Sequence, residues 1–327
     1  MRAAAGKAAC DWLAAHRGEM IELLEAAVNM DSGSSYKAGA DGMATLMEST
    51  LKGAGLATQR HAIATHGDCV SAQSARGEGA HVLLLGHMDT VFPVGTVARR
   101  PFRIDGDLAY GPGVADMKAG LVMNAFVARA LAEVAAEAPP IQLLFTGDEE
   151  VASPASRHLT LERARGARAV FNAEPGRPTG NVVTGRKGAF FIDFEVGGVA
   201  AHAGVNPHKG ASAIDAIARK VVELHQLNDP ANGISANVGT IQGGMTVNTV
   251  ADHARAQLDV RYPGTVDRQA LHAKILEIIQ RSSVKNTHAH VTHEGIFFAL
   301  EPSAQWTLHG ELGNIPPGGL AMEPSRG

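Results

Sequence analysis

The first half of the chain alternates apolar runs with segments of helical periodicity. Residues 11–28 and 42–54 place their apolar side chains three or four positions apart, which predicts two amphipathic helices, the first with Asp11 as its N-cap. Three predicted strands and one predicted helix follow, over 81–86, 139–147 and 167–174, and over 116–137. Apolar strands separated by amphipathic helices predict an α/β fold with a mostly parallel sheet that is covered on both faces.

The pattern changes after residue 186. Residues 189–196 alternate strictly between apolar and polar, which predicts an antiparallel strand with one exposed face. The later segments give the order β-α-β-β-α-β, which is typical of a small ferredoxin-like sheet with two helices on one face. We therefore expect a first domain over 1–186, an α+β domain over 187–296 that is inserted into it or follows it, and a short irregular tail or remnant over 297–327.

Composition narrows the range of functions only slightly. The chain has 327 residues, of which 45% are hydrophobic and 19% charged, and its formal net charge is −4. It carries no basic block that would indicate a nucleic-acid partner, and its apolar runs are too short to span a membrane. Cys10 and Cys69 supply neither a disulfide framework nor a thiolate metal site, so we expect a cytoplasmic protein whose metal ligands, if it has any, are His, Asp and Glu.

Polar residues stand at the carboxyl ends of the predicted strands, the edge where ligands of parallel α/β sheets bind. They are His87, Asp89, Asp148, Glu149, Glu150 and Glu174, and Asp116, which opens the predicted helix after a Gly/Pro-rich loop, is expected at the same edge. Taken singly, each has an ordinary explanation as an exposed histidine, a helix N-cap, a solvated helix start or a turn residue. Together they place like charges at one edge of one sheet, where the charges would repel each other unless cations held them.

This set of side chains suits a particular metal chemistry. Histidine with carboxylates fits Zn²⁺, Co²⁺ or Mn²⁺. A single carboxylate can bridge two ions about 4 Å apart, and Asp116 is central in the series. Asp89 can accept the second N–H of the His87 imidazole. The neighbouring Glu149 and Glu150 diverge, so one can bind metal while the other acts as a general base.

Four motifs, in this order and at these intervals, resemble those of the M20 metallopeptidases: GHMDTV, GPGVADMKAG, TGDEE and NAEP. This group includes glutamate carboxypeptidase, acetylornithine deacetylase, succinyl-diaminopimelate desuccinylase and aminoacylase, and the resemblance is closest to the first. It covers about residues 10–296. It implies a catalytic domain with two divalent ions, usually zinc, interrupted by a lid domain that forms a homodimer. The implied substrate is a small peptide or an N-acyl amino acid.

The resemblance also implies a role for each residue at the sheet edge. His87 and Glu174 would bind the first metal ion, and Glu150 would bind the second. Asp116 would bridge both ions. Glu149 would be the general base, which takes a proton from the metal-activated water and returns it to the leaving amine.

Further roles follow for residues around this set. Asp89 would orient His87, and His202 in the lid would stabilise the oxyanion, in its own or the partner subunit's site. Asn248 and Arg261 resemble lid residues that hold the substrate's carboxylate, for which the fork of arginine is suited. Without the resemblance, His202 would be read as a surface loop residue and Arg261 as a solvent-facing residue on an alternating strand.

The tail departs from the family pattern. The family's Gly-rich segment and late histidine ligand find no match after residue 297, and the surroundings of His309 do not resemble that motif. We therefore expect an incomplete second metal site. Two hypotheses stay open: a metal-dependent hydrolase, which Glu149 favours, and a catalytically impaired relative that binds metal or carboxylate ligands, or dimerises, without turnover, which the short tail favours.

Overall fold

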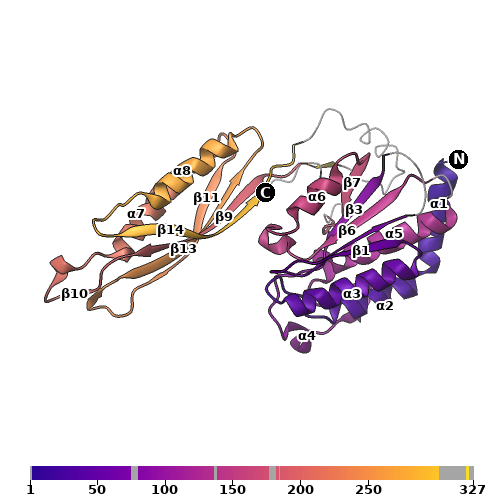
Figure 1. Ribbon diagram of the computed structural model, residues 1–327, viewed down its shortest axis with the longest axis horizontal. Coiled ribbons are helices and arrows are strands. Elements are labelled where there is room, and N and C mark those ends of the chain that lie inside the picture. Colours follow the sequence, from indigo (N-terminus) through magenta and orange to yellow (C-terminus); the bar gives the residue numbers. More distant parts are fainter. Residues whose placement is uncertain are drawn as a thin grey trace. The chain divides into compact units, whose positions relative to one another are not determined.

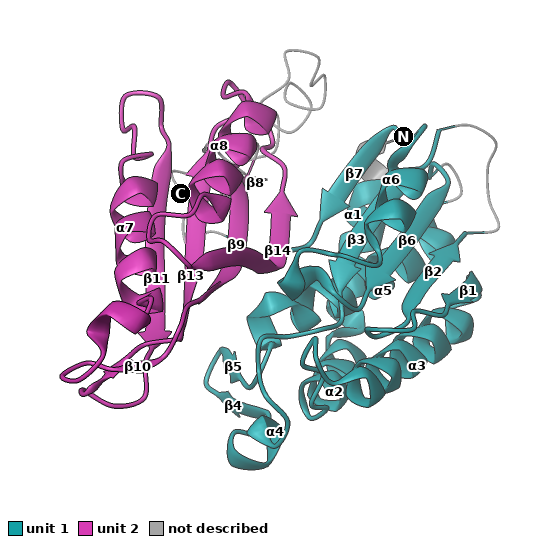
Figure 2. Cartoon of the chain, turned by 60° about the vertical axis from the view of Figure 1, so that its left-hand side comes forward, with its two compact units in different colours: residues 1–176 teal, residues 177–327 magenta. Residues whose placement is uncertain are grey.

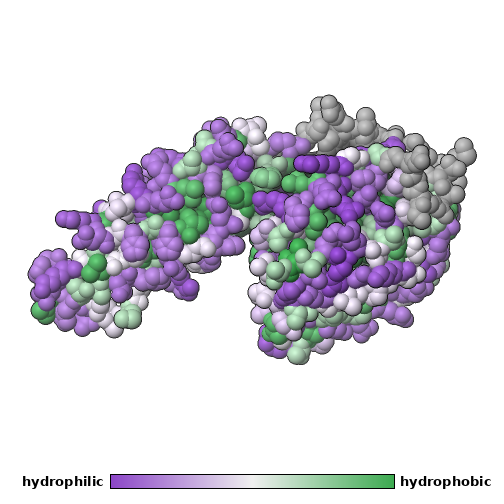
Figure 3. Space-filling view, viewed as in Figure 1, coloured by the Kyte–Doolittle hydropathy of each residue, from purple (hydrophilic) through white to green (hydrophobic). Residues whose placement is uncertain are grey.

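The chain forms two compact units, residues 1–176 and 177–327, which Figure 2 distinguishes by colour. The computed structural model describes residues 2–74, 80–135, 138–176, 182–183, 185–301 and 322–323. Most of the surface in Figure 3 is polar, with scattered hydrophobic residues, because the main apolar clusters lie inside each unit. The predicted α/β domain and α+β domain are both confirmed, whereas the predicted limits at residues 186 and 296 stay predictions.

Unit 1 is built on a five-stranded sheet of order β1-β2-β6-β3-β7 (Figure 1). Its strands are β1 (Ala57–His61), β2 (Cys69–Gln73), β3 (Val82–His87), β6 (Ile141–Thr146) and β7 (Ala169–Asn172). The three parallel strands β3, β6 and β7 are those that the apolar runs predict. The sheet is mixed rather than mostly parallel, because β1 and β2 add an antiparallel edge. These two strands are short and rich in polar residues, so they carry no apolar run.

Helices cover both faces of this sheet. They are α1 (Arg2–Ala15), α2 (Arg17–Val28), α3 (Lys37–Gly53), α4 (Thr96–Arg99), α5 (Ala119–Val134) and α6 (Arg157–Ala164). Residues of α2, α3 and α5 share one core with Leu84, Leu143 and Phe145. Leu159 of α6 packs with Leu83 and other residues on the opposite face. A short hairpin of β4 (Arg103–Asp105) and β5 (Leu108–Tyr110) completes the unit.

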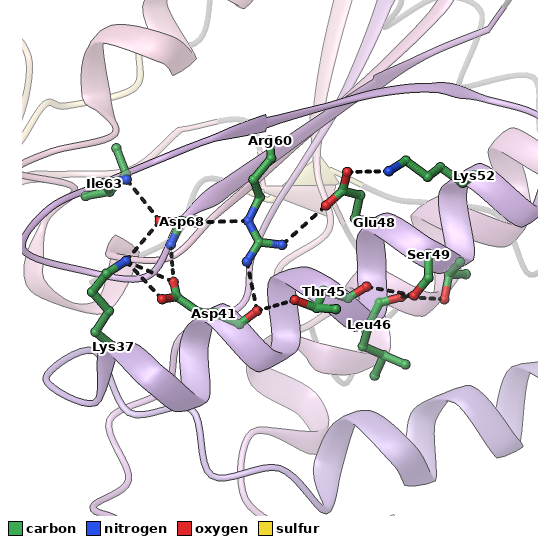
Figure 4. Close-up of polar contacts among 11 residues, drawn as sticks. Lys37, Asp41, Thr45, Leu46, Glu48, Ser49, Lys52, Arg60, Ile63 and Asp68 are labelled. Atoms are coloured by element: carbon green, nitrogen blue, oxygen red, sulfur yellow. Dashed lines mark hydrogen bonds and ion pairs between the residues drawn. The ribbon is translucent and has the colours of Figure 1, made fainter.

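A polar network joins α3 to the loop between β1 and β2 (Figure 4). The Asp68 carboxylate accepts hydrogen bonds from Lys37 Nζ at 2.9 Å, the Ile63 amide at 3.0 Å and Arg60 Nε at 3.1 Å. The Asp41 carboxylate accepts from Lys37 Nζ and from the Asp68 amide. The network therefore fixes the antiparallel edge of the sheet to the helix that packs beneath it.

Unit 2 contains a four-stranded antiparallel sheet of order β11-β13-β9-β14. Its main elements, in chain order, are β9 (Gly188–Gly197), α7 (Ala213–His225), β11 (Ser235–Gly243), β13 (His253–Tyr262), α8 (Arg268–Gln280) and β14 (His288–Phe297). This is the predicted β-α-β-β-α-β order. Phe190, Phe194 and their neighbours on β9 pack against Ile217 of α7 and Ile275 of α8, so both helices cover one face. Two small pairs are β10 (Ala201–His202) with β12 (Thr249–Val250), and β8 (Val182–Val183) with β15 (Met322–Glu323).

Candidate metal centre

His87 stands at the carboxyl end of β3, and its side chain is only 1% exposed. Its Nε2 lies 3.1 Å from Asp116 Oδ1, 3.7 Å from Glu174 Oε1 and 3.8 Å from Glu149 Oε2. These three carboxylates come from three segments that are distant in the sequence. The structure thus brings these residues together at one edge of the sheet, as the sequence predicts.

Two sets of potential metal ligands share His87. One consists of His87, Asp116 and Glu150, and the other of His87, Glu149 and Glu174; within each set the ligand atoms all lie within 4.8 Å of one another. Imidazole nitrogen and carboxylate oxygen are ligands that Zn²⁺ accepts readily. The donor chemistry therefore fits a divalent metal ion. The two sets differ from the division of ligands that the family resemblance implies, because Glu150 shares a set with His87 and Glu149 belongs to a set of potential ligands.

Asp89 is fully buried beside His87 and organises the turn that carries the two glutamates. Its carboxylate accepts hydrogen bonds from Ser34 Oγ at 2.6 Å and from the backbone amides of Glu149 and Glu150, both at 3.1 Å. The Asp89 backbone oxygen lies 3.0 Å from His87 Nδ1, whereas its carboxylate oxygen lies 3.5 Å away. An Nδ1–H that donates to this carbonyl leaves the Nε2 lone pair directed at the carboxylates, as metal binding requires.

Asp148, unlike the two glutamates that follow it, does not belong to either set of potential metal ligands. It is 1% exposed, and its Oδ2 accepts hydrogen bonds from the amides of Ala155 at 2.7 Å and Ser156 at 3.0 Å. It therefore fixes the loop that leads into α6. Glu149 and Glu150 begin a short 3₁₀ turn, Glu149–Val151, and both side chains are half-buried.

Asp116 does not open a helix as its motif predicts. It lies in an irregular turn, Val114–Lys118, with extended backbone angles (φ −114°, ψ 95°) and a cis peptide bond to Met117, and α5 begins only at Ala119. The Met117 sulfur accepts the backbone N–H of His87 at 3.2 Å. A Cβ at Gly120 would clash with the Ala173 carbonyl. The start of α5 therefore packs closely against the ends of both β3 and β7.

The pKa values of Glu149 and Glu150 are both raised by their surroundings. Burial, followed by repulsion from Glu174, Asp89 and Asp116, outweighs the attraction of His87 and raises the pKa of Glu149 to about 7. Burial and neighbouring carboxylates likewise raise the pKa of Glu150 to about 7.

The pKa of His87 moves in the direction that its acidic surroundings favour. Burial would lower it, but the carboxylates of Asp116 and Asp89 raise the pKa of His87 to about 11. A site that raises the pKa of both carboxyl groups and imidazole attracts positive charge, whether protons or a metal ion.

Two residues near the site were missed by the sequence reasoning. Ser34 contacts Asp89 from a distant loop, and the sequence carries no signal for this contact. Lys118 lies two positions after Asp116 in the GPGVADMKAG motif, but its residue type alone predicts no role. It is buried, donates from Nζ to the Met30 carbonyl at 2.8 Å, and burial lowers its pKa to about 8.

The predicted lid residues all lie in unit 2. His202 and Asn248 are exposed neighbours: the β10–β12 pairing aligns His202 with Thr249, and the Asn248 carbonyl accepts the Ala203 amide at 2.9 Å. Arg261 on β13 pairs with Asp259 at 2.8 Å and lies over the Phe191 ring. His309 and nearly all of the predicted tail lie outside the described residues. No helix in the described parts of the chain is both long and apolar enough to cross a membrane.

Comparison with known proteins supports the fold and the motifs. Residues 184–287 match the model of the peptidase dimerisation domain, M20_dimer. Carboxypeptidase G2 of Pseudomonas sp. (strain RS-16) is 30% identical over 269 residues, which cover 81% of this chain and 65% of that protein. Acetylornithine deacetylase of Photorhabdus laumondii is 30% identical over 223 residues, 63% of this chain and 56% of that protein.

Solved structures share the architecture. An M20 family metallo-carboxypeptidase from Sulfolobus solfataricus superposes with a TM-score of 0.71 at 19% identity, and the match covers 90% of this chain and 82% of that one. A dinuclear metal-binding M20 peptidase from Bacillus subtilis gives a TM-score of 0.60 at 14% identity, over 96% of this chain and 84% of that one. The chain spans 65% of the length of carboxypeptidase G2 and 60% of that of a peptidase M20 domain-containing protein of Schizosaccharomyces pombe, which is 28% identical over 249 residues.

Proposed function

Because this chain is a relative of the M20 metallopeptidases, we propose that it is a metal-dependent hydrolase that cleaves an amide bond next to a carboxylate-bearing residue. The reaction would be of the carboxypeptidase or the N-acyl-amino-acid deacylase type. The observation that carries the proposal is the position of His87, whose Nε2 lies within 4 Å of carboxylates from three separate segments. Such a convergence at the carboxyl ends of parallel strands is typical of a catalytic metal centre.

The proposed division of the side chains between two ions follows the family resemblance. In this proposal His87 and Glu174 hold one ion, Glu150 holds the second, and Asp116 bridges them. When bound, divalent ions such as Zn²⁺, Co²⁺ or Mn²⁺ would polarise the scissile carbonyl and activate the attacking water. Asp89 keeps the turn of Glu149 and Glu150 fixed relative to His87, through two backbone N–H donors.

Glu149 is proposed as the general base. Its backbone is held by Asp89, its side chain is half-buried, and its Oε2 lies 3.8 Å from His87 Nε2. A general base must lie within reach of the proton that it accepts, and this position places Glu149 beside the proposed ions. Glu149 would take the proton of the attacking water and deliver it to the leaving amine.

Unit 2 carries further residues with proposed roles, and the proposed dimer interface. We propose that His202 stabilises the oxyanion and that Asn248 and Arg261 hold the substrate's carboxylate. The match of residues 184–287 to a dimerisation domain supports a homodimer formed through this unit. His202 and Asn248 lie together on exposed segments, which is compatible with contact to a substrate.

Substitution of Glu149 tests the proposal. We expect the zinc-loaded protein to hydrolyse N-acetylglutamate or a peptide with a C-terminal glutamate, measured by release of the free amine. Glu149→Gln should lower kcat by at least about 10²-fold while zinc content is unchanged, because it removes proton transfer but not a ligand. Glu162→Gln, at an exposed glutamate of α6, is the matched control and should keep wild-type activity.

The outcomes separate the two hypotheses. Turnover that depends on Glu149 supports the hydrolase. Zinc binding without turnover of any acyl-amino acid or peptide tested would instead support a relative that binds metal and substrate-like carboxylates. Equal activity of Glu149→Gln and the wild type would contradict the role given to Glu149.

A further inference from the structure

The sheet of unit 2 has one face that its helices do not cover. Strand β9 alternates, so Phe190, Phe194 and their neighbours lie in the core with α7 and α8, while Glu195 and Gly197 point to the other side. This second side is called the open face below. It carries histidines from both strands that flank β9, and these histidines have no part in the centre at His87, which lies in unit 1.

The strand register places these histidines around Gly197. His253 of β13 and His288 of β14 are both paired directly with Gly197. In the next row of the same face, Glu195 is paired with His290 of β14. Directly paired side chains on one face lie about 5 Å apart, and diagonal neighbours lie about 7–8 Å apart. His253 and His288 lie on opposite sides of β9, so their backbones are two strand spacings, about 10 Å, apart, with Gly197 between them.

The His288 side chain lies over Gly197, whereas those of His253 and Glu195 approach each other. Glu195 Oε2 lies 3.4 Å from His253 Nε2, across the diagonal. The cross-strand neighbour Arg255 directs its guanidinium to Gln242 Oε1 instead, at 2.6 Å. The ring of His288 occupies the volume that a Cβ at position 197 would need. The glycine thus provides a gap in the middle strand into which ligands from both neighbouring strands can turn.

We propose that His253, His288 and Glu195 form a second metal site, on the open face of unit 2, that binds a divalent transition metal ion such as Zn²⁺. Two imidazoles and a carboxylate are a common ligand set for zinc, and His290 is placed to supply a fourth ligand. The ligand atoms of the three side chains do not all lie within 4.8 Å of one another in the structure. The side chains are exposed or half-buried, so changes of rotamer would bring the nitrogen and oxygen atoms to about 2.0–2.2 Å from one ion. The alternative is an ordinary surface ion pair between His253 and Glu195.

Zinc titration of the full chain tests the site. Zn²⁺ is added to metal-free protein, and the number of bound ions per chain is measured by calorimetry and plasma mass spectrometry. The double variant His253→Gln/His288→Gln should bind one ion fewer than the wild type. The matched control is His208→Gln, at an exposed histidine elsewhere in unit 2, which should bind as many ions as the wild type.

A glycine variant separates a metal site from an ion pair. Gly197→Ala keeps every proposed ligand but fills the gap over which His288 lies, so it should also lose one ion, whereas an ion pair between His253 and Glu195 would be unaffected. Gly197 is not in the left-handed region, so alanine is compatible with its backbone. Circular dichroism checks that each variant is folded. Zinc counts equal to wild type in both the double variant and Gly197→Ala would overturn the proposal.

Discussion

Asp89 shows which properties of a single residue can be read from a sequence and which cannot. Its position two residues after His87 predicts a carboxylate close to the imidazole, and the two side chains are close, at 3.5 Å. The sequence does not reveal that the backbone oxygen, at 3.0 Å, is the nearer partner of Nδ1, or that Ser34 and the turn of the two glutamates converge on the carboxylate. These contacts depend on chain segments about 55 to 61 residues away.

Asp89→Asn should weaken the metal centre without removing a ligand. The amide can accept only on its oxygen, so one of the backbone N–H groups of Glu149 and Glu150 loses its acceptor, and the turn shifts. Changes to such outer partners typically weaken metal affinity about 10–100-fold. The measurement is the zinc dissociation constant from competition with a chelator, with Asp107→Asn on the exposed hairpin as control. An unchanged dissociation constant would refute this role of Asp89.

At the scale of elements, long periodic segments are predictable and short edge strands are not. The apolar strands β3, β6 and β7 and the alternating strand β9 follow directly from their patterns. Strands β1 and β2 do not, because their pairing with β6 depends on the tertiary fold and not on an apolar run. The start of α5 was also misplaced by a few residues, since close packing near Gly120 holds Asp116 outside the helix.

The network that joins α3 to the β1–β2 edge predicts an acid-sensitive contribution to stability. Burial would raise the pKa of Asp68, but hydrogen bonds from Ile63, Lys37 and Arg60 lower it below the usual value. The charged form therefore stabilises the fold above the unfolded pKa of about 3.9, and this contribution is lost as pH falls through the lower folded pKa.

Asp68→Asn should lower the free energy of unfolding at pH 7 by about 2 kcal/mol, because it removes charged acceptors from a half-buried network. The difference from wild type should shrink as pH falls below about 4, first because the carboxylate is protonated in the unfolded state and then because it is protonated in the folded state. Urea denaturation at pH 7 and pH 3 measures both values. A difference that stays constant between these pH values would show that Asp68 acts through packing and not through its charge.

At the scale of the whole molecule, folding brings several buried or half-buried carboxylates close together at one edge of the sheet of unit 1, where they repel one another. The residues responsible were predictable as a set, because parallel strands deliver their carboxyl ends to the same edge. How strongly they affect each other was not predictable, since burial and exact separation set the pKa values. The contribution of unit 2 to a substrate site follows from the family resemblance and stays a prediction.

Burial of the carboxyl groups, together with this repulsion, predicts how the stability of the metal-free protein depends on pH. Glu149 and Glu150 have pKa values of about 7, above their unfolded values, so the folded state binds more protons between about pH 4.5 and 7. The raised pKa of His87 acts in the same direction at higher pH. Stability is therefore greatest below this range and declines as pH rises through it.

Calorimetry of the metal-free protein should show a Tm that falls from pH 6 to pH 8. Excess zinc should raise the Tm at pH 8, because an ion that binds only the folded state stabilises it. The double variant Glu149→Gln/Glu150→Gln, which removes two titrating groups from the cluster, should show a shallower fall. A wild-type Tm that rises between pH 6 and pH 8 would contradict the electrostatic description of the site.

The central claim is that the carboxylates around His87 hold metal, and the zinc content of the dialysed protein tests it most directly. Plasma mass spectrometry should find tightly bound zinc in the wild-type chain. Asp116→Asn should reduce it, because Asp116 Oδ1 lies 3.1 Å from His87 Nε2 and belongs to a set of potential ligands. Asp116 is exposed, so the variant should remain folded. No zinc above the buffer level in the wild type, or equal zinc in both proteins, would contradict the account.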